Sequence, residues 1–348
     1  MFVYWLMFFI PVFALFYPIR MTTVASDWMW RATCALFVLI IGLRFEVGMD
    51  WNNYIEMYMA TLDVAFSDAI VTTDPGYALL NWQSSMLGLG VYAVNFVCAA
   101  VVMTGLYYFC RRQPQPWLAL AIAVPYMLIV AGMGYTRQSA AMGFELLALV
   151  ALSDGRLRRF FILIALAGLF HKSAVLLLPL GILSSSHKKI WVILSMVGMS
   201  VLLGGALLFE YYDTLVTTYV DSNMESEGGP IRVAMNAVPA LLFLLFSKRF
   251  APDANERKLW IWMAVFSLVC VPFVGLASTA VDRVALYFMP IQLFVYSRIG
   301  CLFRHSTYKA LAILTVVAGY GLVEWVLLNK ATFVSFGWVP YQNIAFSW

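Results

Sequence analysis

Charge is scarce in this chain. Of its 348 residues, only 11% are charged and 63% are hydrophobic, whereas a soluble globular domain carries roughly 25% charged residues. This composition excludes an ordinary soluble enzyme and predicts a polytopic membrane protein. The basic residues do not gather as they do on a nucleic-acid-binding surface, so nucleic acid is not expected as a partner.

Cysteine and histidine are also sparse. The five cysteines lie within or beside apolar segments without CxxC spacing, and there are three histidines. A disulfide framework and a Cys/His metal site are therefore not expected. The sequence contains no DxD run or other acidic ligand cluster, which is what a Mg²⁺ or Mn²⁺ site would need. We predict no metal and no cofactor.

Long apolar runs make up most of what is present. They lie at about 1–17, 30–43, 82–109, 117–131, 138–152, 160–170, 174–183, 190–209, 231–247, 259–276, 284–297 and 309–328. They predict an all-α fold, a single transmembrane domain over 1–348 with about 12 transmembrane or re-entrant helices. The first run lacks a charged start, so it is expected to be a retained span and not a cleaved signal.

Two neighbouring runs, 160–170 and 174–183, are too short to cross a membrane comfortably. Eleven helical residues cover about 16 Å, against a hydrocarbon core of about 30 Å. Either their ends extend into the flanks or they form a re-entrant hairpin. In both cases His171 and Lys172 lie at the tip of the hairpin.

Lys and Arg are divided unevenly between the connections. Alternate connections hold 16 of the 22 basic residues, and the other side holds Arg44, Arg137, Lys172, Arg232, Arg283 and Lys330. The positive-inside rule makes the richer side cytoplasmic. Both termini and the long loops at about 44–81 and 210–230 are then external.

The strongly polar clusters all fall on this external face. They run from Arg44 to Tyr54, Asp74 to Tyr77, Tyr135 to Gln138, Phe170 to Ser173, and Asp282 to Tyr287. Charged groups beside hydrocarbon are costly, so several at one level indicate a binding or catalytic site.

Each cluster has a structural alternative. Arg44 either snorkels at the interface or joins Asp50 and Tyr54, which share a helical face, in binding an anionic, hydroxylated ligand. Asp74 is either a turn and helix cap or a catalytic carboxylate. Arg137 opens a helix, where its planar fork and the helix N-terminus favour phosphate; otherwise it is an ordinary external arginine.

Three further residues have two explanations each. Glu145, two turns deeper than Arg137, is either functional or neutralises an arginine. His171 is either a cavity-facing base or donor or a packed core histidine. Asp282 belongs either to the site or to a local ion pair, whereas Arg283 and Tyr287 can share one helical face.

In order and context, these clusters resemble those of the EpsG/Wzy-type polysaccharide polymerases. The resemblance rests on Arg44, Val47 to Asp50, Tyr54, Asp74 to Tyr77, Arg137-Gln138, His171 to Ala174, Asp282-Arg283, Tyr287, and Trp338 to Tyr341. One difference is Asp74, where the family more often has Glu. The resemblance implies a fold like that of the multi-span (GT-C-like) glycosyltransferases, and a place in the bacterial cytoplasmic membrane.

The implied enzyme is a glycosyltransferase acting at the external face. It would transfer a growing glycan from polyprenyl diphosphate to a sugar hydroxyl of a lipid-linked repeat unit, with a chain-length regulator as a further partner. Diphosphate is a good leaving group and needs cations more than a strong acid. The candidate residues are His171, Asp50 and Asp74 for catalysis, Arg44, Arg137 and Arg283 for the diphosphate, and Tyr54, Tyr77, Gln138, Lys172, Tyr287 and Tyr341 for the remaining substrate.

Two other functions fit the composition. A ligase that moves the glycan onto another lipid would use nearly the same residues. A transporter of lipid-linked oligosaccharide would need polar groups through both halves of the membrane, and the cytoplasmic half lacks them beyond its flanking basic residues. The polymerase is therefore the favoured prediction.

Overall fold

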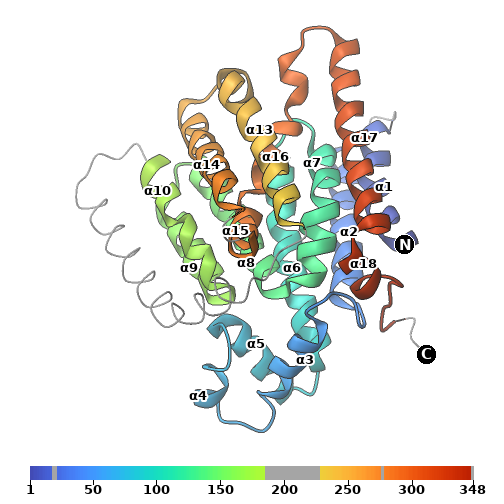
Figure 1. Cartoon of the computed structure of the whole chain (residues 1–348), viewed down its shortest axis with the longest axis vertical. Coiled ribbons are helices and arrows are strands. Elements are labelled where there is room, and N and C mark those ends of the chain that lie inside the picture. The colour runs from blue at the N-terminus through green and yellow to red at the C-terminus, as the bar shows by residue number, and fades with distance from the viewer. Residues whose placement is uncertain (18–21, 185–227, 276–277, 346–348) are drawn as a thin grey trace. The chain divides into compact units, whose positions relative to one another are not determined.

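The computed structural model describes residues 1–17, 22–184, 228–275 and 278–345, and every regular element within them is helical (Figure 1). The elements are α1 (Phe2–Phe16), α2 (Thr23–Gly42), α3 (Trp51–Met59), α4 (Phe66–Ala69), α5 (Pro75–Met86), α6 (Gly90–Cys110), α7 (Pro116–Ala123), the π-helix η1 (Val124–Gly132), α8 (Thr136–Ser153), α9 (Leu157–Phe170), the 3₁₀-helix η2 (Lys172–Leu177), α10 (Leu178–Ser184), α13 (Gly229–Phe250), α14 (Ala254–Phe273), α15 (Ser278–Ala285), η5 (Leu286–Phe288), α16 (Pro290–Tyr296), η6 (Ile299–Leu302), α17 (Ser306–Lys330) and α18 (Thr332–Gly337). The predicted all-α class is confirmed.

Four helices among the described residues are long and apolar enough to cross a membrane: α2, α6, α13 and α17. They have 20 to 25 residues, which correspond to about 30 Å or more of helix. The chain is therefore an integral membrane protein. The total of about 12 helices and the GT-C-like fold stay predictions. The run 190–209 and the loop 210–230 up to residue 227 lie outside the described residues.

The apolar run 82–109 is not one helix. It divides into the end of α5 and the whole of α6, and the backbone turns between them at Gly88 and Gly90, which have φ of 65° and 70°. The Ser84 hydroxyl donates to the Gly90 carbonyl across this turn at 2.6 Å. As a result α5 folds back along α6, and the segment 44–81 holds the short helices α3 and α4.

The chain divides into two compact units that interleave in sequence. The first comprises Met1–Leu146, Leu169–His171 and Leu314–Trp348, and the second comprises Leu147–Gly168 and Lys172–Ile313. Each unit is described separately below, and the single domain over 1–348 stays a prediction.

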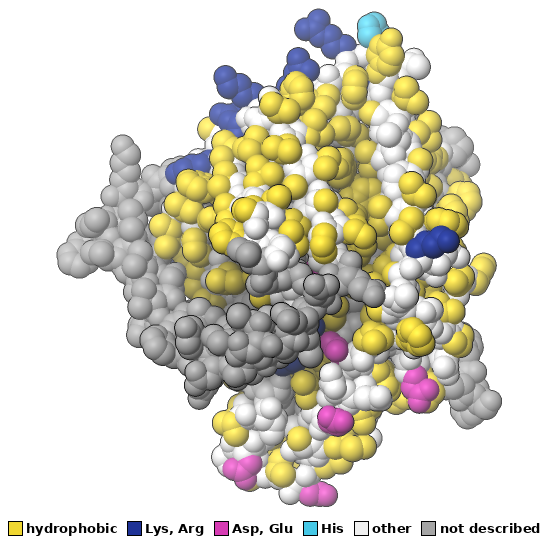
Figure 2. All heavy atoms as spheres, in the orientation of Figure 1, with side chains coloured by type: hydrophobic (Ala, Val, Ile, Leu, Met, Phe, Trp, Pro, Cys, Tyr) yellow, Lys and Arg dark blue, Asp and Glu magenta, His cyan; other side chains and the backbone are white. Residues whose placement is uncertain are grey.

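Charged residues in the first unit separate to the two ends of the α2–α6 pair. At one end Asp27 forms an ion pair with Arg111 and with Arg31, the latter at 2.7 Å. At the other end Gly42 lies against Phe96, so the two helices run antiparallel. The short helices α3 to α5 lie at this second end (Figure 1), where acidic side chains gather on the surface (Figure 2). This arrangement agrees with the predicted alternation of connections, while the assignment of sides stays a prediction.

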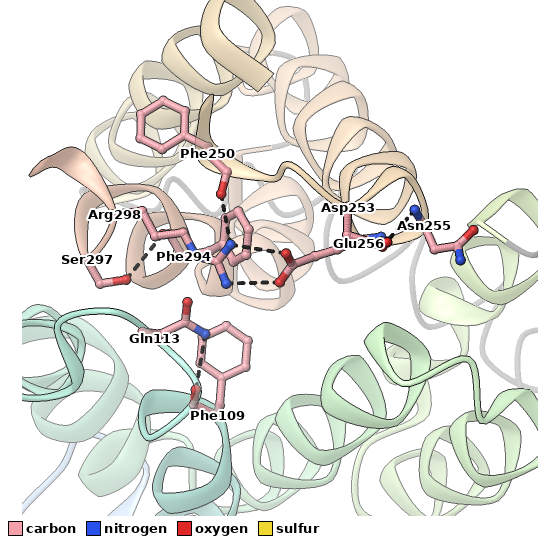
Figure 3. A network of polar contacts seen from close by, with 9 residues as sticks. All are labelled: Phe109, Gln113, Phe250, Asp253, Asn255, Glu256, Phe294, Ser297 and Arg298. Atoms are coloured by element: carbon pink, nitrogen blue, oxygen red, sulfur yellow. Dashed lines mark hydrogen bonds and ion pairs between the residues drawn. The ribbon is translucent and has the colours of Figure 1, made fainter. Parts of the chain in front are cut away.

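The second unit is built on the helical hairpin of α13 and α14, which packs on α15 and α16. At one end of the unit Arg298 binds Glu256 through two nitrogens, at 2.9 and 3.1 Å, and donates to the Phe250 carbonyl (Figure 3). Its guanidinium carbon also lies 3.8 Å from the centre of the Phe294 ring. Lys and Arg side chains gather on the surface around this end (Figure 2).

Helices α6 and α8 approach each other closely through small residues. A Cβ added at Gly143 would lie 2.6 Å from the Val101 carbonyl oxygen, and one at Gly105 would lie 2.3 Å from the Gly143 carbonyl oxygen. Both distances are below any normal contact, so the two backbones pack directly. This packing positions α8, the helix that carries Arg137.

We predict that Gly143→Ala destabilises the protein by about 1–3 kcal/mol, the usual cost of overpacking a tight interface. Gly319→Ala is the matched control, because a Cβ at this helical glycine of α17 meets nothing within 4 Å. Thermal unfolding in detergent should show a lower midpoint for Gly143→Ala and no loss for Gly319→Ala. Equal midpoints in the two variants would contradict the proposed packing.

Candidate functional site

Arg137 is the centre of a polar cluster in the first unit. It is the second residue of α8, and its Nη1 donates to the Asp74 carboxylate at 2.7 Å and to the Thr73 hydroxyl at 2.8 Å. A further side-chain hydrogen bond joins Arg137 to Tyr54. Its Nε is buried and has no partner among the described residues. The guanidinium is thus held on one side, while its side chain as a whole stays partly exposed, at 26%.

Asp74 occupies the N-cap position of α5, immediately before Pro75, but its side chain makes no capping hydrogen bond. Its carboxylate faces Arg137 instead and is only 6% exposed. A carboxylate in contact with a guanidinium is stabilised in its charged form and is a weak base. The geometry therefore favours a positioning role for Asp74 over the predicted catalytic one.

Aromatic side chains pack behind Arg137. The rings of Tyr54 and Tyr77 lie 5.7 Å apart between their centres, within a buried cluster that contains Cys98 and Ala140 and packs against Phe170. Tyr77 is completely buried, and its hydroxyl has no partner among the described residues. Burial raises the pKa of Tyr77 well above its usual value, so the group stays neutral and can donate a hydrogen bond.

His171 lies at the tip of a hairpin, as predicted. It separates α9 from η2, and in the second unit the two arms pack through Gly181 against Phe160. Helix α9 has 14 residues, about 21 Å, which is shorter than the hydrocarbon core. Whether the hairpin spans or is re-entrant stays open. In the first unit Phe170, next to His171, packs on Phe144 at 5.5 Å, so His171 lies near the aromatic cluster.

Arg44 is buried completely and does not snorkel. Its three nitrogens donate to the Val47 carbonyl at 3.2 Å, the Ile41 carbonyl at 2.8 Å and the Thr136 hydroxyl at 2.6 Å. A diphosphate oxygen would have to displace these bonds. The geometry favours a structural role, in which Arg44 fixes the residue directly before Arg137.

The C-terminal segment packs against the end of α2 and the loop that follows it. The Tyr341 hydroxyl donates to the Ile40 carbonyl at 2.9 Å, and the Gly48 N–H donates to the Gly337 carbonyl at 2.6 Å. Gly48 has a φ of 106° and lies against Met133, a position that only glycine tolerates. Tyr341 therefore acts as a structural contact here, and its predicted substrate role remains a prediction.

Other predicted residues of the first unit are less informative. Asp50 precedes α3 as its N-cap residue and makes no capping bond, and its backbone carbonyl accepts from the Tyr54 N–H at 3.0 Å. Gln138 follows Arg137 and is buried. The Glu145 carboxylate is fully buried, and neither oxygen has a partner in the described part of the chain, so it does not neutralise an arginine there.

The remaining candidates lie in the second unit. Ser173 donates to the Tyr287 hydroxyl at 3.3 Å, so the structure brings together the Lys172-Ser173 turn and Tyr287. Arg283 lies on α15 next to Asp282, which forms a buried two-point ion pair with Arg232. Asp282 thus forms an ion pair, as one of its two explanations held, but the partner shown is Arg232, 50 residues away, and not a local residue.

Sequence reasoning missed Thr73, Thr136 and Arg232. A hydroxyl beside a motif arginine carries no spacing signal, and neither threonine could have been chosen from sequence. Arg232 had one signal, its place among the few basic residues on the predicted external side, but its partner is 50 residues away.

The EpsG family model matches residues 27–343, nearly the whole chain. The protein belongs to the EpsG family. This family consists of polysaccharide polymerase-like membrane proteins, which confirms the resemblance found in the motifs. No curated protein and no solved structure gives a significant match. For this EpsG-family protein, the roles of individual residues stay predictions.

We predict that Tyr77→Phe separates binding from stability. Removing a buried hydroxyl that lacks a partner should leave the unfolding midpoint unchanged or raise it, because an unsatisfied buried polar group costs about 1–3 kcal/mol. If the hydroxyl contacts substrate, KM should rise several-fold with little change in kcat. A lower midpoint would show instead that the hydroxyl has a structural partner in the native protein.

Proposed function

We propose that this EpsG-family protein polymerises a polysaccharide from lipid-linked units. A glycan carried on polyprenyl diphosphate would be transferred to a sugar hydroxyl of a second lipid-linked unit. Family membership supports the polymerase class, and the chemistry of the Arg137 cluster supports a diphosphate-linked donor. Both are consistent with an integral membrane protein whose substrate is carried by lipid.

The proposal rests on the contacts and the exposure of Arg137. Asp74, Thr73 and Tyr54 hold its guanidinium, its side chain is 26% exposed, and its Nε has no partner within the part of the chain that the structure describes. A planar guanidinium presents several donors to phosphate oxygens. The N-terminus of α8 adds the positive end of a helix dipole.

The chemistry requires little more than charge stabilisation and a base. The acceptor hydroxyl oxygen would form a bond to the anomeric carbon, and the bond from that carbon to the diphosphate oxygen would break. The diphosphate leaves with the electron pair, and Arg137 and Arg283 would stabilise its charge. The hydroxyl proton would pass to a base.

His171 and Asp50 are the two candidate bases that remain after Asp74. The carboxylate of Asp74 forms an ion pair with Arg137, whereas His171 lies at a hairpin tip beside the aromatic cluster. We favour His171. Tyr77, Gln138 and Tyr287 would contact the saccharide, because hydroxyls and amides can both donate to and accept from sugar hydroxyls, and Lys172 would act as a donor only.

The proposed place of reaction is the external face of the bacterial cytoplasmic membrane. The positive-inside rule supports this side, and the charges of the first unit lie at two separate ends of the α2–α6 pair. A chain-length regulator stays a proposed partner.

We predict that Arg137→Lys impairs polymer formation by roughly tenfold or more, because lysine keeps the charge and loses the planar fork. The assay would supply purified protein with lipid-diphosphate oligosaccharide and measure polymer and released lipid diphosphate. Arg31→Lys is the control, since Arg31 is exposed at the opposite end of α2.

Normal rate and polymer length in folded Arg137→Lys protein would contradict this role. Transfer of the glycan to a different lipid would indicate a ligase. Movement of substrate across vesicles without a new linkage would indicate a transporter.

We predict that His171→Gln abolishes nearly all activity, because glutamine keeps hydrogen-bonding capacity and lacks useful basicity. Partial retention in His171→Gln would indicate a positioning role. Wild-type rates in both His171→Gln and His171→Ala would transfer the base role to Asp50.

A further inference from the structure

The second unit contains a buried ion pair that the proposed reaction does not use. Arg232, in the first turn of α13, donates through Nε and Nη2 to both oxygens of Asp282 on α15. The two side chains are only 4% and 3% exposed. The pair therefore joins two helices through two parallel bonds, which fix orientation as well as distance.

A second set of contacts continues from this pair. The Asn236 amide, one turn after Arg232, donates to the Ala285 carbonyl at 2.7 Å and accepts from the Gln292 amide at 2.6 Å. Asn236 and Gln292 are both buried. Helix α13 thus holds α15 both at Asp282 and at Ala285, the last residue of that helix.

Arg283 lies between these two fixed points. The next contact along the chain is at Tyr287, which receives a hydrogen bond from Ser173. Arg283 is partly exposed, while its neighbours Asp282 and Ala285 are buried. Its backbone is thus held from both sides, and its side chain extends from a part of α15 that cannot rotate without breaking the Arg232 pair.

We propose that Arg232 is a positioning residue that acts through Asp282 to aim Arg283 at the donor diphosphate. This inference rests on the proposed function. Arg232 would act through its ion pair, because its Nε and Nη2 both donate to Asp282. A displacement of about 1 Å at a charge-stabilising group can cost about a hundredfold in rate, so the pair would control turnover without taking part in it.

Apolar replacement of the whole pair separates positioning from stability. Removing one partner would leave a buried unpaired charge and destabilise the fold, whereas replacing both with apolar residues is often neutral or stabilising. The test variant is therefore Arg232→Met with Asp282→Leu. The matched control is Arg298→Met with Glu256→Leu, which replaces another two-point ion pair of this unit, whose side chains are 10% and 22% exposed.

The measurements are the unfolding midpoint, the Kd for farnesyl diphosphate, and kcat in the polymer assay. We expect the Arg232/Asp282 replacement to keep its midpoint, with Kd weakened about tenfold and kcat lowered. The Arg298/Glu256 replacement should keep both Kd and kcat. Wild-type Kd and kcat in folded Arg232/Asp282 protein would overturn the proposal.

A double-mutant cycle with Arg283→Ala tests whether the effect passes through Arg283. In the Arg283→Ala background, replacing the Arg232/Asp282 pair should change Kd by less than about twofold. If replacing the Arg232/Asp282 pair weakens Kd by the same factor with and without Arg283→Ala, the proposal is overturned. If Arg283→Ala alone leaves Kd and kcat unchanged, Arg283 does not bind diphosphate and the proposal also fails, while the Arg137→Lys result still tests the polymerase function.

Should the double replacement not fold, Arg232→Lys gives a second test. It keeps the charge and loses the two-point geometry, so we expect weaker binding of farnesyl diphosphate in folded protein. An unchanged Kd for this variant would overturn the proposal.

Discussion

The complete burial of the Arg44 guanidinium constrains the whole first unit. A buried charge is tolerated only when its donors are satisfied, and Arg44 finds its acceptors at the end of α2, in the following loop and at Thr136, the first residue of α8. These bonds bring three segments to one point. Arg137, the next residue, is thereby placed opposite Asp74, and the aromatic cluster packs behind it.

Buried arginines in the second unit also need acceptors, but there the acceptors are mainly carboxylates. Its buried arginines, Arg232 and Arg298, each bind a carboxylate through two nitrogens. The first pair lies near Arg283, and the second joins the ends of α13, α14 and α16. In each unit a buried arginine thus holds helices together, whereas the Nε of Arg137 has no partner in the described ranges.

Local features could be predicted from the sequence. Composition predicted the all-α membrane class, and the two short apolar runs predicted the hairpin with His171 at its tip. The order of the motifs indicated the family. Gly88 and Gly90 also carried the signal for the break between α5 and α6, which the hydrophobic run obscured. Arg137 was correctly placed at the start of a helix, because helix start signals are local.

Partners distant in sequence could not be predicted. Arg44 forms a hydrogen bond with Thr136, 92 residues away, and Arg232 binds Asp282, 50 residues away. Residue spacing carries no information about contacts over such separations. Of the two explanations for Arg44, snorkelling at the interface was wrong, because the residue is completely buried. For Asp74 the sequence offered a cap or a catalytic carboxylate, and it gave no sign of the ion pair with Arg137.

The hydrogen bonds from Gly48 to Gly337 and from Phe45 to Gln342 have a consequence for biosynthesis. The loop that follows α2 leaves the ribosome well before the backbone groups of Gly337 and Gln342 that complete it. This loop contains Arg44 and leads into α3. The Arg137 region therefore reaches its final form only after Gln342 has been made, so a chain terminated before that residue would enter the membrane without an assembled site.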